Sequence, residues 1–201
     1  MKSINDIYEG IFDNDAEEKL DKDVALDEIW QDLTTKYGEI LLGSARGAVT
    51  VDNIDLDNKG RIIFKNWPGP KISFYLGSID SFPESVQKRG FGELPKNVKE
   101  VEITEARCKL SQLGFRHKYP GVTLSVYGGN IEMDTFPKFD SIDFRGAFFT
   151  NTHILPKPVP RGMNIFFNES SIDNIFSDWC QRFFKGAYPM WDRDGGQKIK
   201  L

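Results

Sequence analysis

VKEVEITEA at residues 98–106 and FDSIDFRGA at residues 139–147 share one pattern that decides the fold. Each stretch places apolar residues at its first, fourth and sixth positions and an alanine at its ninth. Apolar residues that alternate with polar ones along an extended chain predict a strand with one buried face. A pattern that returns this faithfully after about forty residues indicates that the chain repeats a structural unit.

The central apolar pair of this pattern occurs six times along the chain. The pairs are Ile54/Leu56, Phe74/Leu76, Val101/Ile103, Leu124/Val126, Ile142/Phe144 and Ile165/Phe167. Their starts are separated by 20, 27, 23, 18 and 23 residues, and five of the six follow a proline closely. Strands that return every 20–29 residues are typical of stacked coils. We therefore expect an α/β protein built as an irregular solenoid with one sheet.

The first pair has a second interpretation. Residues 57–60 (DNKG) are a turn signal, and the apolar run at residues 61–64 follows directly. Two short apolar runs around such a turn also predict a plain β-hairpin. The sequence favours neither the hairpin nor a first coil.

Both ends of the chain carry helical patterns. Residues 3–12 begin with a near match to a capping box and place apolar residues on one face. Residues 23–38 predict a second helix that covers the open end of the coils, and residues 170–186 predict a C-terminal capping helix. These boundaries predict an acidic N-terminal helix and linker at 1–22, one solenoid-like domain with helical caps at 23–186, and a tail at 187–201.

The repeats resemble a degenerate leucine-rich repeat over residues 50–170. Val, Ile and Phe stand where that family has leucines, and Ala106, Gly129 and Ala147 stand where it has asparagine or cysteine. The opening segment, residues 4–13, is similar to a short N-terminal segment of uncharacterised tailed-bacteriophage proteins. The resemblance implies a leucine-rich-repeat-like architecture and a phage-encoded protein, placed in the cytoplasm of the host cell or in the virion.

Composition restricts the partners. Residues 1–40 carry twelve acidic and four basic side chains, whereas the remainder carries 18 acidic and 22 basic ones. This balance is too weakly basic for a nucleic-acid footprint, and no apolar run is long enough to span a bilayer. We therefore expect a protein partner, with no membrane and no nucleic acid, and an oligomeric state that the sequence does not give.

The candidate chemical motifs favour ordinary structural roles. Residues 55–60 begin like a calcium loop but lack the acid that should end it, so a turn is favoured. Cys180 lies on an apolar helix face, and Cys108, which follows a strand, has no charged neighbourhood that would activate it. We expect no cofactor, no metal and no catalytic residue, and the sequence favours a protein that is not an enzyme.

The residues between the buried pairs give the best functional indication. If the strands stack in parallel, these residues form one continuous polar and aromatic surface with aromatic anchors. The candidate binding residues are Tyr75, Glu100, Glu102, Tyr127, Asp143, Arg145 and Phe166. The leading hypothesis is a non-catalytic interaction protein, either associated with the virion or directed at a host factor.

Two other functions remain open at this stage. Carboxylates on one strand face could form the acid/base pair of a small hydrolase or nuclease. The acidic residues 13–32 could instead occupy the basic site of a target, as an inhibitor or immunity-type protein does.

Overall fold

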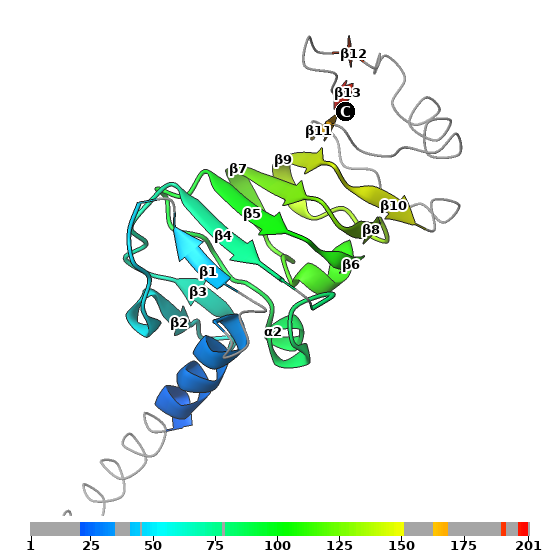
Figure 1. Cartoon of the computed structure of the whole chain (residues 1–201). Coiled ribbons are helices and arrows are strands. Elements are labelled where there is room, and N and C mark those ends of the chain that lie inside the picture. The colour runs from blue at the N-terminus through cyan, green and yellow to red at the C-terminus, as the bar shows by residue number, and fades with distance from the viewer. Residues whose placement is uncertain are drawn as a thin grey trace, which may run out of the picture.

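The computed structural model describes residues 21–34, 41–44, 46–77, 79–150, 163–168, 190–191 and 197–200 (Figure 1). These residues form a mixed α/β structure with few helices and one large, mostly parallel sheet in the order β1-β4-β5-β7-β9-β11-β13-β12. Its strands are β1 (Leu41–Ser44), β4 (Lys71–Tyr75), β5 (Glu100–Thr104), β7 (Lys118–Tyr127), β9 (Lys138–Arg145), β11 (Asn164–Asn168), β12 (Met190–Trp191) and β13 (Gln197–Lys200).

Two smaller sheets complete the described β-structure. One is a parallel sheet of β6 (Arg107–Lys109), β8 (Asn130–Glu132) and β10 (Phe148–Thr150). The other is an antiparallel hairpin of β2 (Ile54–Leu56) and β3 (Ile62–Phe64). The helical elements are residues 21–33, α2 (Glu84–Arg89) and the 3₁₀ helices η1 (Val51–Asn53) and η2 (Leu110–Leu113).

The apolar pairs lie side by side in the large sheet. Val101, Leu124, Ile142 and Ile165 are direct neighbours on β5, β7, β9 and β11, and the second members of these pairs are neighbours in the same way. On β4 the matching pair is Ile72/Phe74, so the predicted Phe74/Leu76 alignment was wrong by two residues. Leu76 follows the strand, where its N–H donates to the carbonyl of Thr104. It is buried there, so it matches the hydrophobic pattern without belonging to the ladder.

A tight corner after each of three strands sends the chain into the second sheet. The first corner residue is Glu105, Gly128 or Gly146, each with a positive φ. The next residue is Ala106, Gly129 or Ala147, packed against its counterpart in the adjacent corner. A Cβ atom on Gly129 would lie 1.8 Å from the carbonyl oxygen of Ala106. The small residue at the ninth position of the pattern is therefore required by the close approach of neighbouring corners.

Aromatic rings fill the core beneath the large sheet. Phe91 stacks on Phe115 with ring centres 4.5 Å apart, and Tyr119 stacks on Phe139 at 4.6 Å. The buried Tyr119 hydroxyl donates to the carbonyl of Phe91 at 2.9 Å, which satisfies its polar atom. Rings from successive turns of the chain thus lie one above the other and tie the repeated units together.

The N-terminal helix packs against the end of the molecule that holds β2, β3 and α2 (Figure 1). Ile29 and Leu33 are buried in the core. Asp32 accepts a hydrogen bond from Ser85 at the start of α2, and Lys22 Nζ lies 2.8 Å from Asp55 Oδ1 at the start of the hairpin. A helix at residues 21–33 is therefore present where the sequence predicted one over 23–38, and residues 35–38 lie outside the described part.

Several predictions need correction at the level of the elements. The antiparallel β2–β3 pair resolves the first apolar pair as a hairpin. The prediction of a single sheet is wrong, because the chain continues from β5, β7 and β9 into a second sheet and β2 pairs with β3 in a third. Within residues 187–201, β12 pairs with β13 and β13 pairs with β11 in the large sheet, and the division of the chain into a domain and a tail stays a prediction. The predicted helices at 3–12 and 170–186 lie outside the described residues.

Candidate functional site

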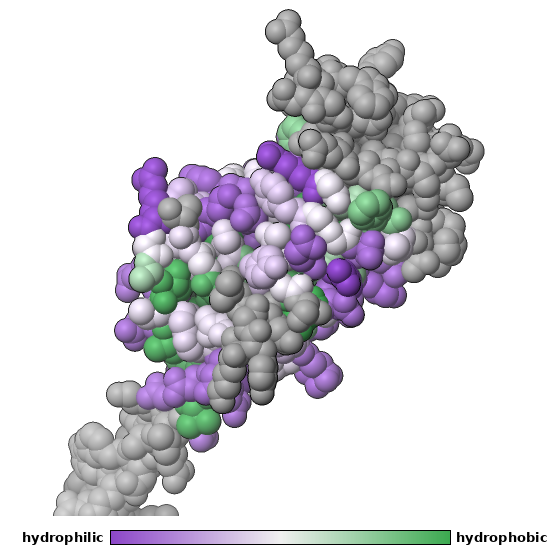
Figure 2. Space-filling view, in the orientation of Figure 1, coloured by the Kyte–Doolittle hydropathy of each residue, from purple (hydrophilic) through white to green (hydrophobic). Residues whose placement is uncertain are grey.

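The candidate binding residues all project from β4, β5, β7, β9 and β11 at positions between the buried pairs. The register places Tyr75, Thr104, Tyr127 and Arg145 in one row across the sheet. Ser73, Glu102, Ser125, Asp143 and Phe166 form a second row. Alternate residues of a strand point to opposite faces, so these rows lie on the face that points away from the core. We call this surface the outer face. In Figure 2, the surface over β4, β5, β7 and β9 is largely coloured as hydrophilic or neutral.

One lysine bridges the two glutamates. Lys71, at the start of β4, lies 2.7 Å from Glu102 Oε2 and 3.4 Å from Glu100 Oε2. All three side chains are largely covered, with 22–30% of each exposed. Burial alone would lower the pKa of Lys71, but the hydrogen bond to Glu102 and the charges of both glutamates raise it above its usual value. The lysine therefore stays protonated and lies between the two glutamate side chains.

The second charged group combines an acid, a base and a tyrosine. Arg145 donates from Nε to Asp143 Oδ2 at 2.9 Å, and its Nη2 lies 2.8 Å from the same oxygen. The guanidinium carbon also lies 5.3 Å from the centre of the Tyr127 ring, a cation–π geometry. The hydrogen bond to Asp143 raises the pKa of Arg145, while burial raises the pKa of Tyr127 against the lowering influence of Arg145. These contacts fix the tyrosine ring in place.

Two aromatic residues extend the outer face on either side of these groups. Tyr75 is 44% exposed, which among the residues that the structure describes is shared only by the large hydrophobic residues Val24 and Phe148. Phe166 lies beside Asp143 on the next strand and is half-buried. In the centre of the face, Ser125 is only 3% exposed. The outer face therefore has a fixed, charge-paired middle and an exposed tyrosine at one side.

The carboxylates are not arranged as an acid/base pair. Asp143 and Glu102 belong to strands that are separated by β7, so their backbones are about 10 Å apart. Each of these acids is already paired with a cation of its own. Among the residues that the structure describes, no group of three or more His, Cys, Asp or Glu side chains could hold a metal ion. Asp143 and Glu102 are therefore not gathered as a pair for proton transfer, whereas Glu100 and Glu102 of one strand share the ammonium of Lys71.

Sequence reasoning missed Lys71. The predicted alignment used Phe74 and Leu76 and therefore left out the start of β4. At that position Lys71 is the direct neighbour of Glu100. A signal was present, because two glutamates on one strand face need a nearby cation to be half-covered without large cost. Aligning Ile72/Phe74 with Val101/Ile103 would have placed Lys71 beside them.

The remaining motifs have structural roles. Asp57 accepts hydrogen bonds from the backbone N–H of Lys59 and Arg61, and its other oxygen accepts Arg61 Nε at 2.6 Å. The Arg61 side chain lowers the pKa of Asp57 to about 2, so this loop is an ion-paired hairpin turn. Cys108 is buried in the core, and burial raises the pKa of its thiol to about 12.

The acidic segment of the third hypothesis is described only in part. Residues 21–32 are helical, and Asp21, Asp23, Asp27 and Glu28 are exposed on that helix. Residues 13–20 lie outside the described ranges.

Comparison with known proteins gives no further lead. No family model matches the chain, and neither the curated proteins nor the solved structures that were searched contain a match. Within the described residues, no helix is both long and apolar enough to cross a membrane.

Proposed function

We propose that this protein is a non-catalytic interaction protein that binds a protein partner through the outer face. In this proposal, the strand–corner–strand units form an irregular solenoid of the leucine-rich-repeat-like kind, and its large sheet carries the recognition surface. The partner is a virion component or a host factor. The continuity of the outer face across five strands in register is the observation that carries the proposal.

Preorganisation supports a binding role for this face. The side chains of the charged groups are already ordered by Lys71 and by the Asp143–Arg145–Tyr127 contacts. A partner therefore does not have to order them, which lowers the entropic cost of association. Tyr and Arg are also the residues most often found at the energetic centres of interfaces, and both stand in one row here.

The same contacts make the hydrolase hypothesis the weaker one. A general acid or base must reach a proton of its substrate, whereas Glu102 and Asp143 each hold a cation and lie apart. No described feature of the outer face favours a catalytic role over recognition.

The experiment is capture of a partner with the tagged full-length protein, followed by direct measurement of affinity with the purified partner. Tyr75→Ala should weaken binding at least about tenfold, because truncation of an exposed interface tyrosine removes a hot-spot contact. The matched control is Phe148→Ala on the small sheet, since Phe148 is also an exposed aromatic residue, at 59%. Equal binding by the wild type and the Tyr75 variant, or a loss confined to the Phe148 variant, would contradict the proposal.

A further inference from the structure

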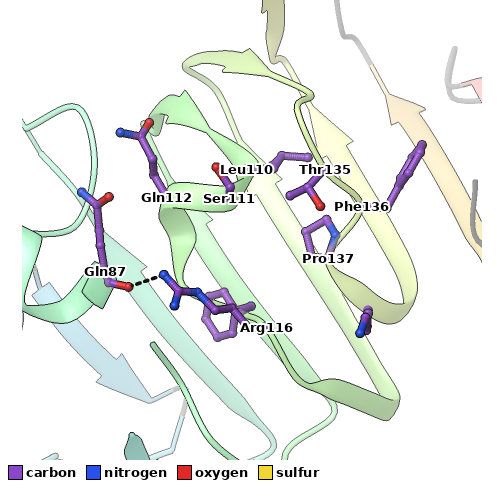
Figure 3. A pocket seen from close by; sticks show the side chains of 10 residues that line it. Gln87, Leu110, Ser111, Gln112, Arg116, Thr135, Phe136 and Pro137 are labelled. Atoms are coloured by element: carbon purple, nitrogen blue, oxygen red, sulfur yellow. Dashed lines mark hydrogen bonds between the residues drawn. The ribbon is translucent and has the colours of Figure 1, made fainter. Parts of the chain in front are cut away.

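A hollow of about 400 Å³ lies away from the outer face, between α2, η2 and the loop that leads into β9 (Figure 3). Gln87 and Arg116 line one side of it, and Thr135 and Pro137 lie on the other. Phe115 contributes a buried aromatic surface. The hollow therefore combines apolar walls with polar side chains, which is the usual composition of small-ligand sites.

The charge beside this hollow is positive. Arg116 and Lys138 line it, and Lys118 is the direct neighbour of Lys138 on the adjacent strand. All three side chains are exposed, and none forms an ion pair with another residue of the described ranges. Two lysines placed side by side in a sheet repel each other, so an anion between these cations would be stabilised.

The acidic side chains near the hollow accept hydrogen bonds from other groups. Asp134 accepts hydrogen bonds from both the N–H and the hydroxyl of Ser111. Asp140 accepts the N–H of Gly121 at 2.7 Å. These carboxylates therefore anchor loops beside the hollow, and neither forms an ion pair with Arg116, Lys118 or Lys138.

Hydrogen-bond donors also line the hollow. Arg116 donates through Nη2 to the carbonyl of Gln87 at 2.8 Å, which holds the guanidinium at the hollow and leaves its other N–H groups available (Figure 3). Gln112 accepts the N–H of Lys109 through Oε1 at 2.8 Å, so its amide nitrogen remains a donor. The hydroxyl of Thr135, on the opposite side, forms no hydrogen bond with another described residue.

We propose that this hollow binds a small organic anion, with a carboxylate or phosphate group attached to a flat apolar body. The anionic group lies against the guanidinium of Arg116, with the charge of Lys138 on the same hollow. The apolar body lies against Phe115 and Pro137. This site is separate from the outer face, so the proposal does not depend on the proposed function.

The test is titration of the full-length protein with phenyl phosphate, followed by NMR and calorimetry. A ligand of this size should bind with a dissociation constant of about 1 mM. Inorganic phosphate, which lacks the body, and phenol, which lacks the charge, should each bind at least about tenfold more weakly. Chemical-shift changes should centre on residues 110–116 and 135–138.

Paired variants locate the site. Arg116→Gln combined with Lys138→Gln should weaken phenyl phosphate binding about tenfold or more, because both charge-assisted contacts are removed. The control combines Arg46→Gln with Lys96→Gln, which removes the same charge from two exposed residues outside the hollow. The absence of saturable binding, equal binding of inorganic and phenyl phosphate, or equal weakening in both double variants would overturn the proposal.

Discussion

The two faces of the large sheet are built from the same strands but differ in the residues that they carry. On the inner face, the row Ile72, Val101, Leu124, Ile142 and Ile165 uses only branched aliphatic residues, each nearly or fully buried. On the outer face, the row one residue further along uses Ser73, Glu102, Ser125, Asp143 and Phe166.

This difference means that the residues of the inner face relate to the fold, whereas those of the outer face relate to function. The inner face must fill space at a constant spacing, so similar residues return at each strand. The outer face mixes paired charges, hydroxyl groups and aromatic rings, and no single residue class returns at each strand. The apolar pattern that indicates the strands of the sheet therefore contains no information about what the outer face recognises.

The largest contrast is expected between neighbouring residues of β4. Phe74 is fully buried and contacts the rings of Phe82 at 5.0 Å and Phe91 at 5.5 Å, whereas Tyr75 points outward. Phe74→Ala should lower the free energy of unfolding by about 3–5 kcal/mol, because it opens a cavity among aromatic rings. Tyr75→Ala should change it by less than about 1 kcal/mol.

Urea denaturation followed by fluorescence and circular dichroism measures both values. If the two variants lose similar stability, the assignment of the inner and outer faces of β4 is wrong.

The inner face was the part of the fold that sequence reasoning could recover. Alternation placed four apolar pairs, from Val101/Ile103 to Ile165/Phe167, in the register that the structure shows. It failed at β4, because Leu76 is also buried and sequence cannot distinguish a strand residue from an apolar residue just after the strand. It also missed the second sheet, whose three-residue strands are too short to show a period.

The candidate site was recovered in part for a similar reason. Alternate residues of a strand point to opposite faces, so position along the strand is enough to assign a residue to the outer face. All seven candidates lie on those strands at the expected positions. Which charges pair with each other depends on register and on side-chain reach across strands. The Lys71–Glu102 contact joins residues 31 positions apart and could not be derived from spacing alone.

A smaller effect is expected at the corners that separate the two faces. Gly129→Ala should lower the free energy of unfolding by about 2 kcal/mol or more, because the new Cβ would collide with the Ala106 carbonyl and the residue has φ of +81°. Gly121→Ala is the matched control, since Gly121 has φ of +72° but nothing lies within 4 Å of the added carbon. The control should lose about 1 kcal/mol.

Thermal and urea unfolding give the free energy of unfolding of both variants. Both share the strain of a positive φ, so the difference between their free energies of unfolding measures the cost of the steric collision at Gly129 alone. Equal losses would show that the corners have room for a side chain, and that the small residue after each strand has another cause.

The smallest effect is expected on the outer face itself. Asp143→Asn should lower the free energy of unfolding by about 1–2 kcal/mol, because Asp143 is only 8% exposed and receives two charge-assisted contacts from Arg145. The control is Glu84→Gln on α2, whose ion pair with Lys88 at 2.9 Å is 74–80% exposed and should contribute less than about 0.5 kcal/mol. Urea denaturation at low and high salt measures both, and salt should reduce the already small effect of the Glu84 substitution more than that of the Asp143 substitution. If Asp143→Asn proves as mild as its control, the charged groups do not order the outer face, and the preorganisation on which the proposed binding role rests is absent.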